Sequence, residues 1–277
     1  MTQWAQFVHC GTRARGDGGP CLRVHSRPVR GASCIVVCAA MLLLSASQGL
    51  GQMPAAKQRI FRPDGPGPYP AVLFVPGCDG FAPPMAPRLY ERRAAEFRGR
   101  GYLVVFVDYL GQRGLKSCAA GSITHHDAAR DLIAEAAWLA TQTFVDPARI
   151  AAIGWSYGGR AVLVSLAERG RGPLPFTRAA VFYPDCRALE PLKTTVPVLM
   201  LLGAEDDMTP SRLCEDIARR STPSAMVTTV VYPGAWHGFD VPELPAKKRH
   251  GLATIGHDPQ AAAAAWEELR RFLGAAK

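Results

Sequence analysis

The sequence lacks three features that would each have indicated a class of protein. Its apolar stretch near the N-terminus, residues 31–44, is too short for a membrane span, which needs roughly 20 residues. The four cysteines beyond residue 52 show no C-x-x-C or cysteine–histidine ligand spacing, so no metal site is expected. The net charge of +9 includes no basic run interleaved with aromatic residues, so no nucleic-acid partner is expected.

Residues 1–52 differ from the rest of the chain. Residues 1–31 carry five arginines and one aspartate without periodicity, and residues 32–52 carry no charge. A basic flank, a short apolar core and small residues after it are typical of a secretory signal. We therefore expect this leader to lie outside the fold and the protein to be periplasmic or extracellular, with no stable membrane insertion after signal removal. A buried helix or a retained anchor is the alternative, and translation could start near residue 24.

The remaining chain, residues 57–275, is predicted to form one α/β domain. Short apolar runs predict strands at 71–75, 103–107, 150–154, 179–183, 196–202 and 226–232. Helical patterns lie between or after them, at 86–100, 126–143, 158–169 and 259–274. This alternation indicates a mostly parallel central sheet with helices on both faces. No second domain or repeat is evident, and no feature defines an oligomeric state.

A sharp turn after the strand 150–154 carries the candidate nucleophile. Residues 154–158 read Gly-Trp-Ser-Tyr-Gly, which fits the pattern G-x-S-x-G between a strand and a helix. The glycines allow a tight turn that presents the Ser156 hydroxyl at the edge of the sheet. The backbone N–H of Tyr157, at the start of the next helix, would stabilise a developing oxyanion. A glycine-rich turn with an inert serine is the alternative.

A serine at neutral pH needs a general base, which a histidine polarised by a carboxylate supplies. His237 follows the predicted strand 226–232, and Asp206 and Asp207 both follow the strand 196–202. The order serine, acid, histidine is the one this arrangement requires. Because the two aspartates are adjacent, their spacing does not separate them. A loop histidine without a catalytic role is the alternative for His237.

The second oxyanion donor should come from the loop after the first core strand. Residues 76–80 read Pro-Gly-Cys-Asp-Gly at that place, so we assign the backbone N–H of Cys78. Export would also permit disulfides. Four cysteines allow three pairings, and we expect Cys78–Cys118 and Cys186–Cys214, because each pair would lie on neighbouring loops. Four free thiols are the alternative.

Taken together, these motifs resemble the dienelactone hydrolase family of the α/β-hydrolase superfamily. The resemblance covers residues 57–275 and includes the Pro-Gly-Cys-Asp-Gly loop, the turn at 154–159, Tyr-Pro-Asp-Cys at 183–186 and His-Gly-Phe at 237–239. It implies the α/β-hydrolase fold and no cofactor. The family places its acid three residues after a strand-end glycine and four before a proline, which selects Asp206. A substrate-binding arginine follows the strand 103–107 in this family, and Arg113 lies nearby.

Ser156 departs from the founding dienelactone hydrolases, which use a cysteine nucleophile. The resemblance and the serine together imply an enzyme that hydrolyses small carboxylic esters or lactones through an acyl-enzyme. Two alternatives stay open. One is a serine peptidase of the prolyl-oligopeptidase type, which has a similar nucleophile motif but usually a longer spacing between serine and acid. The other is a non-catalytic binding protein with this fold.

Overall fold

The predicted strands form the centre of a seven-stranded sheet with the order β1-β3-β2-β4-β5-β6-β7. The structure is a computed structural model that describes residues 60–82, 86–119, 121, 123–167, 173–222 and 226–274. The leader, residues 1–52, lies outside these residues. The strands of the sheet are β1 (Ile60–Phe61), β2 (Tyr69–Val75), β3 (Leu103–Phe106), β4 (Val145–Trp155), β5 (Arg178–Phe182), β6 (Val198–Gly203) and β7 (Val227–Tyr232).

The strands from β2 to β7 run parallel to their neighbours, and β1 pairs antiparallel with β3 at one edge. In the register, Ala71 of β2 lies between Leu103 of β3 and Ile150 of β4. The central strands are buried on both faces, which explains why they read as continuous apolar runs. The prediction of a mostly parallel α/β fold is confirmed.

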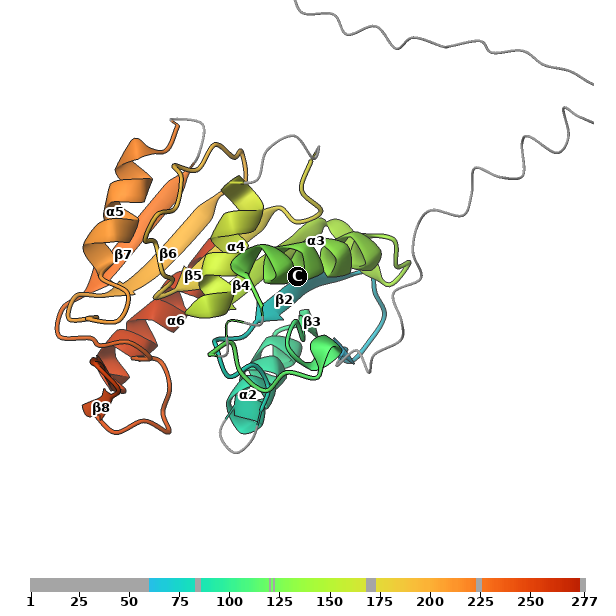
Figure 1. Cartoon of the computed structure of the whole chain (residues 1–277). Coiled ribbons are helices and arrows are strands. Elements are labelled where there is room, and N and C mark those ends of the chain that lie inside the picture. Colours follow the sequence, from blue (N-terminus) through green and yellow to red (C-terminus); the bar gives the residue numbers. More distant parts are fainter. Residues whose placement is uncertain are drawn as a thin grey trace, which may run out of the picture. The chain divides into compact units, whose positions relative to one another are not determined.

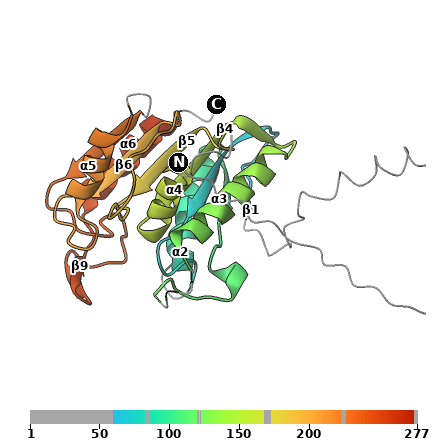
Figure 2. The ribbon, with the colours of Figure 1, turned by 45° about the horizontal axis from the view of Figure 1, so that its top comes forward.

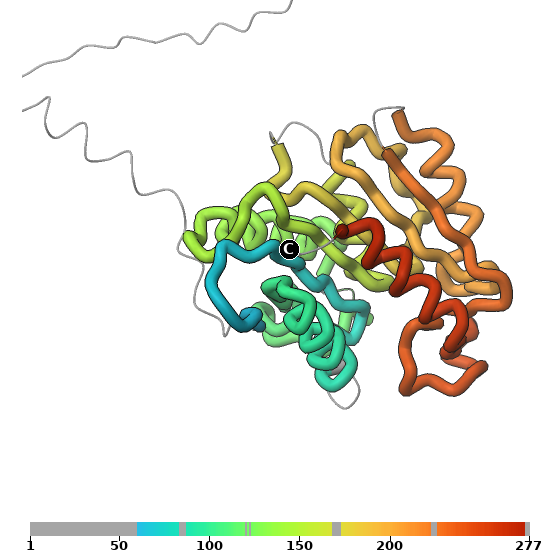
Figure 3. The backbone as a smooth tube through the Cα atoms, turned by 180° about the vertical axis from the view of Figure 1, so that it is seen from behind, coloured from blue at the N-terminus to red at the C-terminus, as the bar shows by residue number. Residues whose placement is uncertain are grey.

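Two layers of helices cover the sheet. The helices α3 (His125–Ala140), α4 (Tyr157–Ala167) and α5 (Ser211–Arg220) cover one face, and α2 (Ala86–Gly99) and α6 (Pro259–Leu273) cover the other, as the opposite views in Figures 1 and 3 show. Successive side chains of β2 enter different cores. Leu73 and Val75 pack beneath α3 and α4, and Val72 and Phe74 pack beneath α2 and α6.

Capping residues in the sequence mark where two of the helices begin. Thr124 precedes α3, and its hydroxyl accepts a hydrogen bond from the N–H of Asp127, whose carboxylate accepts from Thr124 N in return. Asp258 accepts from the first backbone N–H groups of α6, and Pro259 follows it. Both arrangements satisfy backbone donors that a helix leaves unpaired at its start.

Some elements were not predicted. The helix α5 is rich in charged residues and buries only Cys214 and Ile217, so no apolar run marks it in the sequence. The strands β8 (Lys248–His250) and β9 (Ala253–Ile255) form a short polar hairpin after β7, visible in Figure 2. The strand β4 begins at Val145, before its apolar run, and the intervening residues include Pro147. Polar or exposed segments of this kind lack the apolar periodicity on which strand prediction depends.

The carboxyl ends of β2, β4, β6 and β7 lie at one edge of the sheet, and the loops that leave them carry the predicted site residues. In open parallel sheets, ligands bind beyond this edge. Residues Pro54–Lys277 form one compact unit. In the part of the chain that the structure describes, no helix is long and apolar enough to cross a membrane.

Candidate active site

Ser156 lies on a tight turn between β4 and α4. Its backbone φ of 48° is in the left-handed region, which is unusual for a residue other than glycine. A β-carbon on Gly154 would lie 2.6 Å from the carbonyl oxygen of Gly158, and one on Gly158 would lie 2.2 Å from that of Val75. The glycines on both sides of Ser156 are therefore required by close backbone contacts.

The side chains of Ser156, His237 and Asp206 form a continuous chain of hydrogen bonds. Nε2 of His237 lies 2.9 Å from Oγ of Ser156. Its Nδ1 lies 2.8 Å from Oδ2 of Asp206. The side chains of both His237 and Asp206 are buried. In this arrangement the imidazole can accept the serine proton at Nε2 while the carboxylate holds Nδ1–H.

Asp206 is held by several donors of its own loop. Its Oδ1 accepts hydrogen bonds from the backbone N–H groups of Met208 and Thr209, at 2.9 and 2.8 Å. Its Oδ2 accepts from the hydroxyl of Thr209 at 2.8 Å. Asp207 points elsewhere and accepts hydrogen bonds from the backbone and hydroxyl of Thr254. The geometry therefore places Asp206, and not Asp207, against His237.

The loop after β2 lies beside Ser156. A β-carbon on Gly77 would be 3.7 Å from Cβ of Ser156. Gly77 N–H donates to the hydroxyl of Tyr90 at 3.0 Å, and the Gly77 carbonyl accepts from the hydroxyl of Tyr109 at 2.7 Å. The Cys78 carbonyl accepts from Cys118 N–H at 2.8 Å. These bonds hold the loop that carries Cys78, whose neighbour Gly77 lies next to Ser156.

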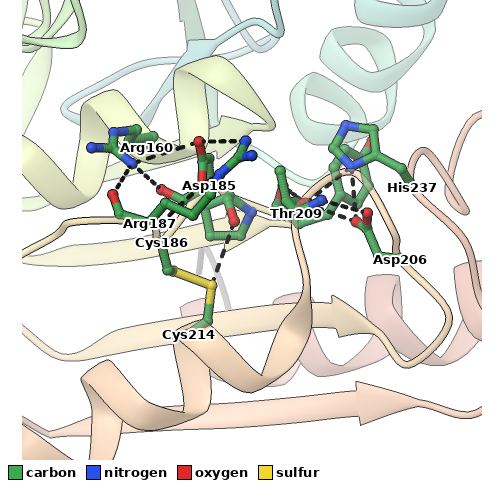
Figure 4. Close-up of a disulfide and its surroundings, with 10 residues drawn as sticks. Arg160, Asp185, Cys186, Arg187, Asp206, Thr209, Cys214 and His237 are labelled. Atoms are coloured by element: carbon green, nitrogen blue, oxygen red, sulfur yellow. Dashed lines mark hydrogen bonds and ion pairs between the residues drawn. A yellow bond between two sulfur atoms is a disulfide. The ribbon is translucent and has the colours of Figure 1, made fainter. Parts of the chain in front are cut away.

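Two disulfides hold loops at this edge of the sheet. The Cys78–Cys118 bond joins the loop after β2 to the long loop after β3. The Cys186–Cys214 bond joins the loop after β5 to α5 (Figure 4). Next to the second disulfide, Asp185 binds the guanidinium groups of Arg160 and Arg187. Burial alone would raise the pKa of Asp185, but its hydrogen bonds to Arg187 lower that pKa below its usual value.

Arg113 lies in the short helix η1 (Gly111–Arg113) of the loop after β3. Its guanidinium donates to the carbonyl of Tyr109 at 2.7 Å and binds both carboxylate oxygens of Asp131. These bonds tie the loop to α3. Asp108, two residues after β3, accepts a hydrogen bond from the N–H of Gly111, the first residue of this short helix.

His125 is the first residue of α3. Its ring stacks on Tyr157, with the ring centroids 4.0 Å apart. Partial burial and the nearby Arg160 lower the pKa of His125 to about 4. The imidazole is therefore neutral at pH 7, and it packs against the residue that follows Ser156.

Sequence reasoning also missed the role of three buried side chains at or beside the site. They are Thr209, Tyr183 and Asp240. The hydroxyl of Thr209 lies 3.1 Å from His237 Nδ1 (Figure 4). The same hydroxyl lies 3.1 Å from the carbonyl of Tyr183. The motif containing Tyr183 was visible in the sequence, but nothing in the pattern indicated that its side chain meets that of Asp240.

Metal-assisted chemistry has no evident ligand set here. Among the residues that the structure describes, no group of three or more histidine, cysteine, aspartate or glutamate side chains is arranged to hold a metal ion.

Comparison with solved structures identifies related folds. A putative dienelactone hydrolase from Klebsiella pneumoniae aligns with a TM-score of 0.60 and 20% identity, over 77% of this chain and 90% of that one. An esterase from Thermogutta terrifontis, solved with bound propionate, aligns with a TM-score of 0.57 and 19% identity, over 80% and 95% of the two chains. At this level of identity the likeness shows a common fold.

Sequence comparison gives a closer relationship. An uncharacterised protein of Mycobacterium tuberculosis is 34% identical over 199 residues, which cover 64% of this chain. The chain spans 66% of the length of that relative. The model of the dienelactone hydrolase family matches residues 57–277, which include all three side chains of the hydrogen-bonded chain and both disulfides. The protein therefore belongs to the dienelactone hydrolase family.

Proposed function

We propose that the protein is a serine hydrolase that cleaves carboxylic ester or lactone bonds through Ser156, His237 and Asp206. The observation that carries this proposal is the unbroken path from Ser156 Oγ through His237 to Asp206, with distances of 2.9 and 2.8 Å. Family membership and the fold shared with an esterase solved with bound propionate support an ester substrate.

The reaction proceeds in two steps. Ser156 Oγ attacks the ester carbonyl while His237 Nε2 accepts its proton, and the alcohol leaves with that proton as the acyl-enzyme forms. Water then attacks the acyl carbon and loses a proton to His237. His237 passes this proton to Ser156 Oγ as the bond between the acyl carbon and Oγ breaks and the acid is released. Asp206 stabilises the imidazolium in both steps. The backbone N–H groups of Cys78 and Tyr157 stabilise the oxyanion. These steps require no cofactor.

The choice of serine rather than cysteine as the nucleophile affects which class of substrate we propose. A serine needs the histidine to remove its proton, because an alkoxide is not accessible at neutral pH, whereas a cysteine is partly ionised on its own. The buried pair of His237 and Asp206 supplies this base. We therefore propose simple carboxylic esters as the main substrate class, with lactones as cyclic members of the same class.

A panel of p-nitrophenyl esters of graded chain length, with simple lactones and peptide p-nitroanilides, tests this proposal. We expect ester hydrolysis, and the Ser156→Ala variant should lose at least about 10⁴-fold in kcat. A fluorophosphonate probe should label Ser156. The matched control is Ser165→Ala, since Ser165 is another buried serine, on α4, whose hydroxyl bonds the Val162 carbonyl. It should keep its activity.

Other outcomes of the panel would contradict the proposal. Hydrolysis of peptide anilides with no ester hydrolysis would indicate a peptidase. A folded protein that hydrolyses nothing, and whose Ser156 does not react with the probe, would indicate a binding protein. Full esterase activity in Ser156→Ala would remove Ser156 from the mechanism.

We also propose that the protein is exported. The signal-like leader, residues 1–52, motivates this proposal. The two disulfides of the domain support it, because disulfides persist mainly in oxidising compartments.

A further inference from the structure

A buried ion pair lies beneath the active-site edge of the sheet. The side chain of Asp240 is fully buried, and it pairs with Arg93, whose side chain is 6% exposed. The guanidinium of Arg93 also lies over the ring of Trp155, 4.7 Å from its centroid. Removing two charges from water is costly, and replacing such a pair by apolar residues is often neutral or stabilising. A contribution to the stability of the fold is therefore a poor explanation for the burial of Arg93 and Asp240.

The carboxylate of Asp240 binds residues that flank the proposed catalytic groups. Its Oδ1 accepts a hydrogen bond from the hydroxyl of Tyr183 at 2.5 Å. Its Oδ2 accepts from the indole N–H of Trp155, the residue before Ser156, at 3.2 Å. Asp240 itself follows His237 by three residues on the same loop. One carboxylate thus joins the ends of β4 and β5 to the histidine loop.

Tyr183 extends this connection to His237 and the acid loop. Its ring packs against the His237 ring, with centroids 4.6 Å apart. Its carbonyl accepts a hydrogen bond from Thr209, which bonds Asp206 in turn. Tyr183 has a φ of 38°, a costly conformation for a tyrosine that persists when surrounding contacts impose it. Burial raises the pKa of Tyr183 well above its usual value, so the hydroxyl stays protonated and donates to Asp240.

We propose that Tyr183, fixed by its hydrogen bond to Asp240, is a positioning residue that holds the His237 ring between Ser156 and Asp206. This inference rests on the proposed function and adds the residue that orients His237 for it. If the imidazole could tilt, its Nε2 would no longer be aligned with Ser156 Oγ for proton transfer, whereas substrate binding would change little. A misplacement of about 1 Å can cost about 10²-fold in rate. The expected effect therefore falls on kcat.

The Tyr183→Phe variant tests the proposal because it removes the hydroxyl and keeps the ring. We expect kcat for a p-nitrophenyl ester to fall about 10-fold or more, with KM changed less than about twofold. The rate of fluorophosphonate labelling of Ser156 should fall in parallel. The matched control is Tyr102→Phe, since Tyr102 is also buried and donates its hydroxyl to the Gly274 carbonyl at 2.8 Å, at the other end of the sheet. It should keep kcat.

A second variant, Asp240→Asn, removes the charge and keeps the shape. It should lower kcat at least as much as Tyr183→Phe, and the double variant should lose less than the sum of the two free-energy changes, because both remove the same connection. A kcat within twofold of the wild type in folded Tyr183→Phe would overturn the proposal, as would equal losses in Tyr102→Phe. An inactive wild type would instead contradict the proposed function, so the two failures are distinguishable.

Discussion

Asp206 and Asp207 are neighbours in sequence with different surroundings. Asp206 is buried and receives hydrogen bonds from its own loop and from His237. Asp207 is more exposed and binds Thr254 of the β9 strand, and those hydrogen bonds lower its pKa below the usual value. Asp206 therefore belongs to the proposed catalytic site, whereas Asp207 connects its loop to β9.

The pair Asp206→Asn and Asp207→Asn provides a matched test at this scale. In Asp206→Asn the amide no longer holds the imidazole with its proton on Nδ1, so we expect kcat to fall by about 10³- to 10⁴-fold with little change in folding. Asp207→Asn should keep kcat within about threefold, since Asp207 does not contact His237. Steady-state kinetics with a p-nitrophenyl ester measure both. Equal effects would contradict the assignment of the acid.

The protonation of His125 should make the free energy of unfolding depend on the pH. Its pKa is lowered to about 4 in the folded protein by partial burial and by Arg160, whereas it titrates near 6.5 when unfolded. Between these values the unfolded chain binds the proton more readily. The free energy of unfolding should therefore fall as the pH decreases from about 6.5 to 4, and it should be unaffected by this residue above that range.

The His125→Gln variant removes this titration. The melting temperature should fall between pH 7.5 and pH 5 in both proteins, and in the variant it should fall about 2–4 °C less than in the wild type. This difference corresponds to about 1 kcal/mol, a figure that allows for the partial exposure of the ring. Thermal unfolding followed by circular dichroism measures the difference. His250→Gln is the control, since His250 is exposed on β8. A wild-type pH dependence in His125→Gln would refute the assignment.

Among the elements, the loops after β2, β5, β6 and β7 position the site, and disulfides hold two of them. The Cys78–Cys118 bond closes a segment of 40 residues and fixes the loop that carries the proposed oxyanion donor. The Cys186–Cys214 bond closes 28 residues and fixes the loop after β5. Loop-closure entropy predicts similar stabilisation from the two, about 3–4 kcal/mol each.

Removing the disulfides one at a time separates stability from activity. Cys78→Ala/Cys118→Ala and Cys186→Ala/Cys214→Ala should lower the free energy of unfolding by similar amounts. The first should also lower kcat about 10-fold, because Cys78 N–H is a proposed oxyanion donor and loss of one donor costs up to 10²–10³-fold. The second should affect kcat less. Urea unfolding and ester kinetics measure the two effects, and equal losses of kcat would contradict this role of the first disulfide.

At the scale of the whole molecule, the sheet separates two cores of different composition. The core beneath α2 and α6 is rich in aromatic rings, among them Phe74, Phe97, Trp155 and Phe182. The core beneath α3, α4 and α5 is mainly aliphatic. The Arg93–Asp240 pair lies against the aromatic core, where Arg93 also contacts the ring of Trp266. Packed aromatic rings therefore lie beneath the edge of the sheet that carries the candidate site.

Export is a property of the whole chain and can be tested on it. Expressed with its leader in a bacterial host, the protein should be recovered from the periplasm with its first residue between about 45 and 57. N-terminal sequencing of the fractionated protein measures this, and titration with a thiol reagent should find no free thiol among the four domain cysteines. A variant that lacks residues 1–52 should stay in the cytoplasm. Recovery of the full-length wild type from the cytoplasm would refute export.

Periodicity and chain order in the sequence were sufficient to predict the parallel sheet, the Ser156 turn and the order in which His237 and an acid follow it. These features are local, because each strand is a buried run and each site residue follows one. The helix α5 and the β8–β9 hairpin could not be predicted in the same way, since α5 has few apolar residues among its ten. The strands β8 and β9 have only three residues each, and all three of β8 are exposed.

Contacts between distant residues were decided by the tertiary structure. It shows Asp206 in contact with His237, a choice that spacing left open and that only the family resemblance had indicated. It also brings Tyr183 to Asp240, 57 residues away along the chain. Such contacts depend on the side-chain directions of several loops at once, and a one-dimensional pattern does not contain that information. The sequence alone determines that a serine, a histidine and an acid reach one edge of the sheet, and packing determines how they are held there.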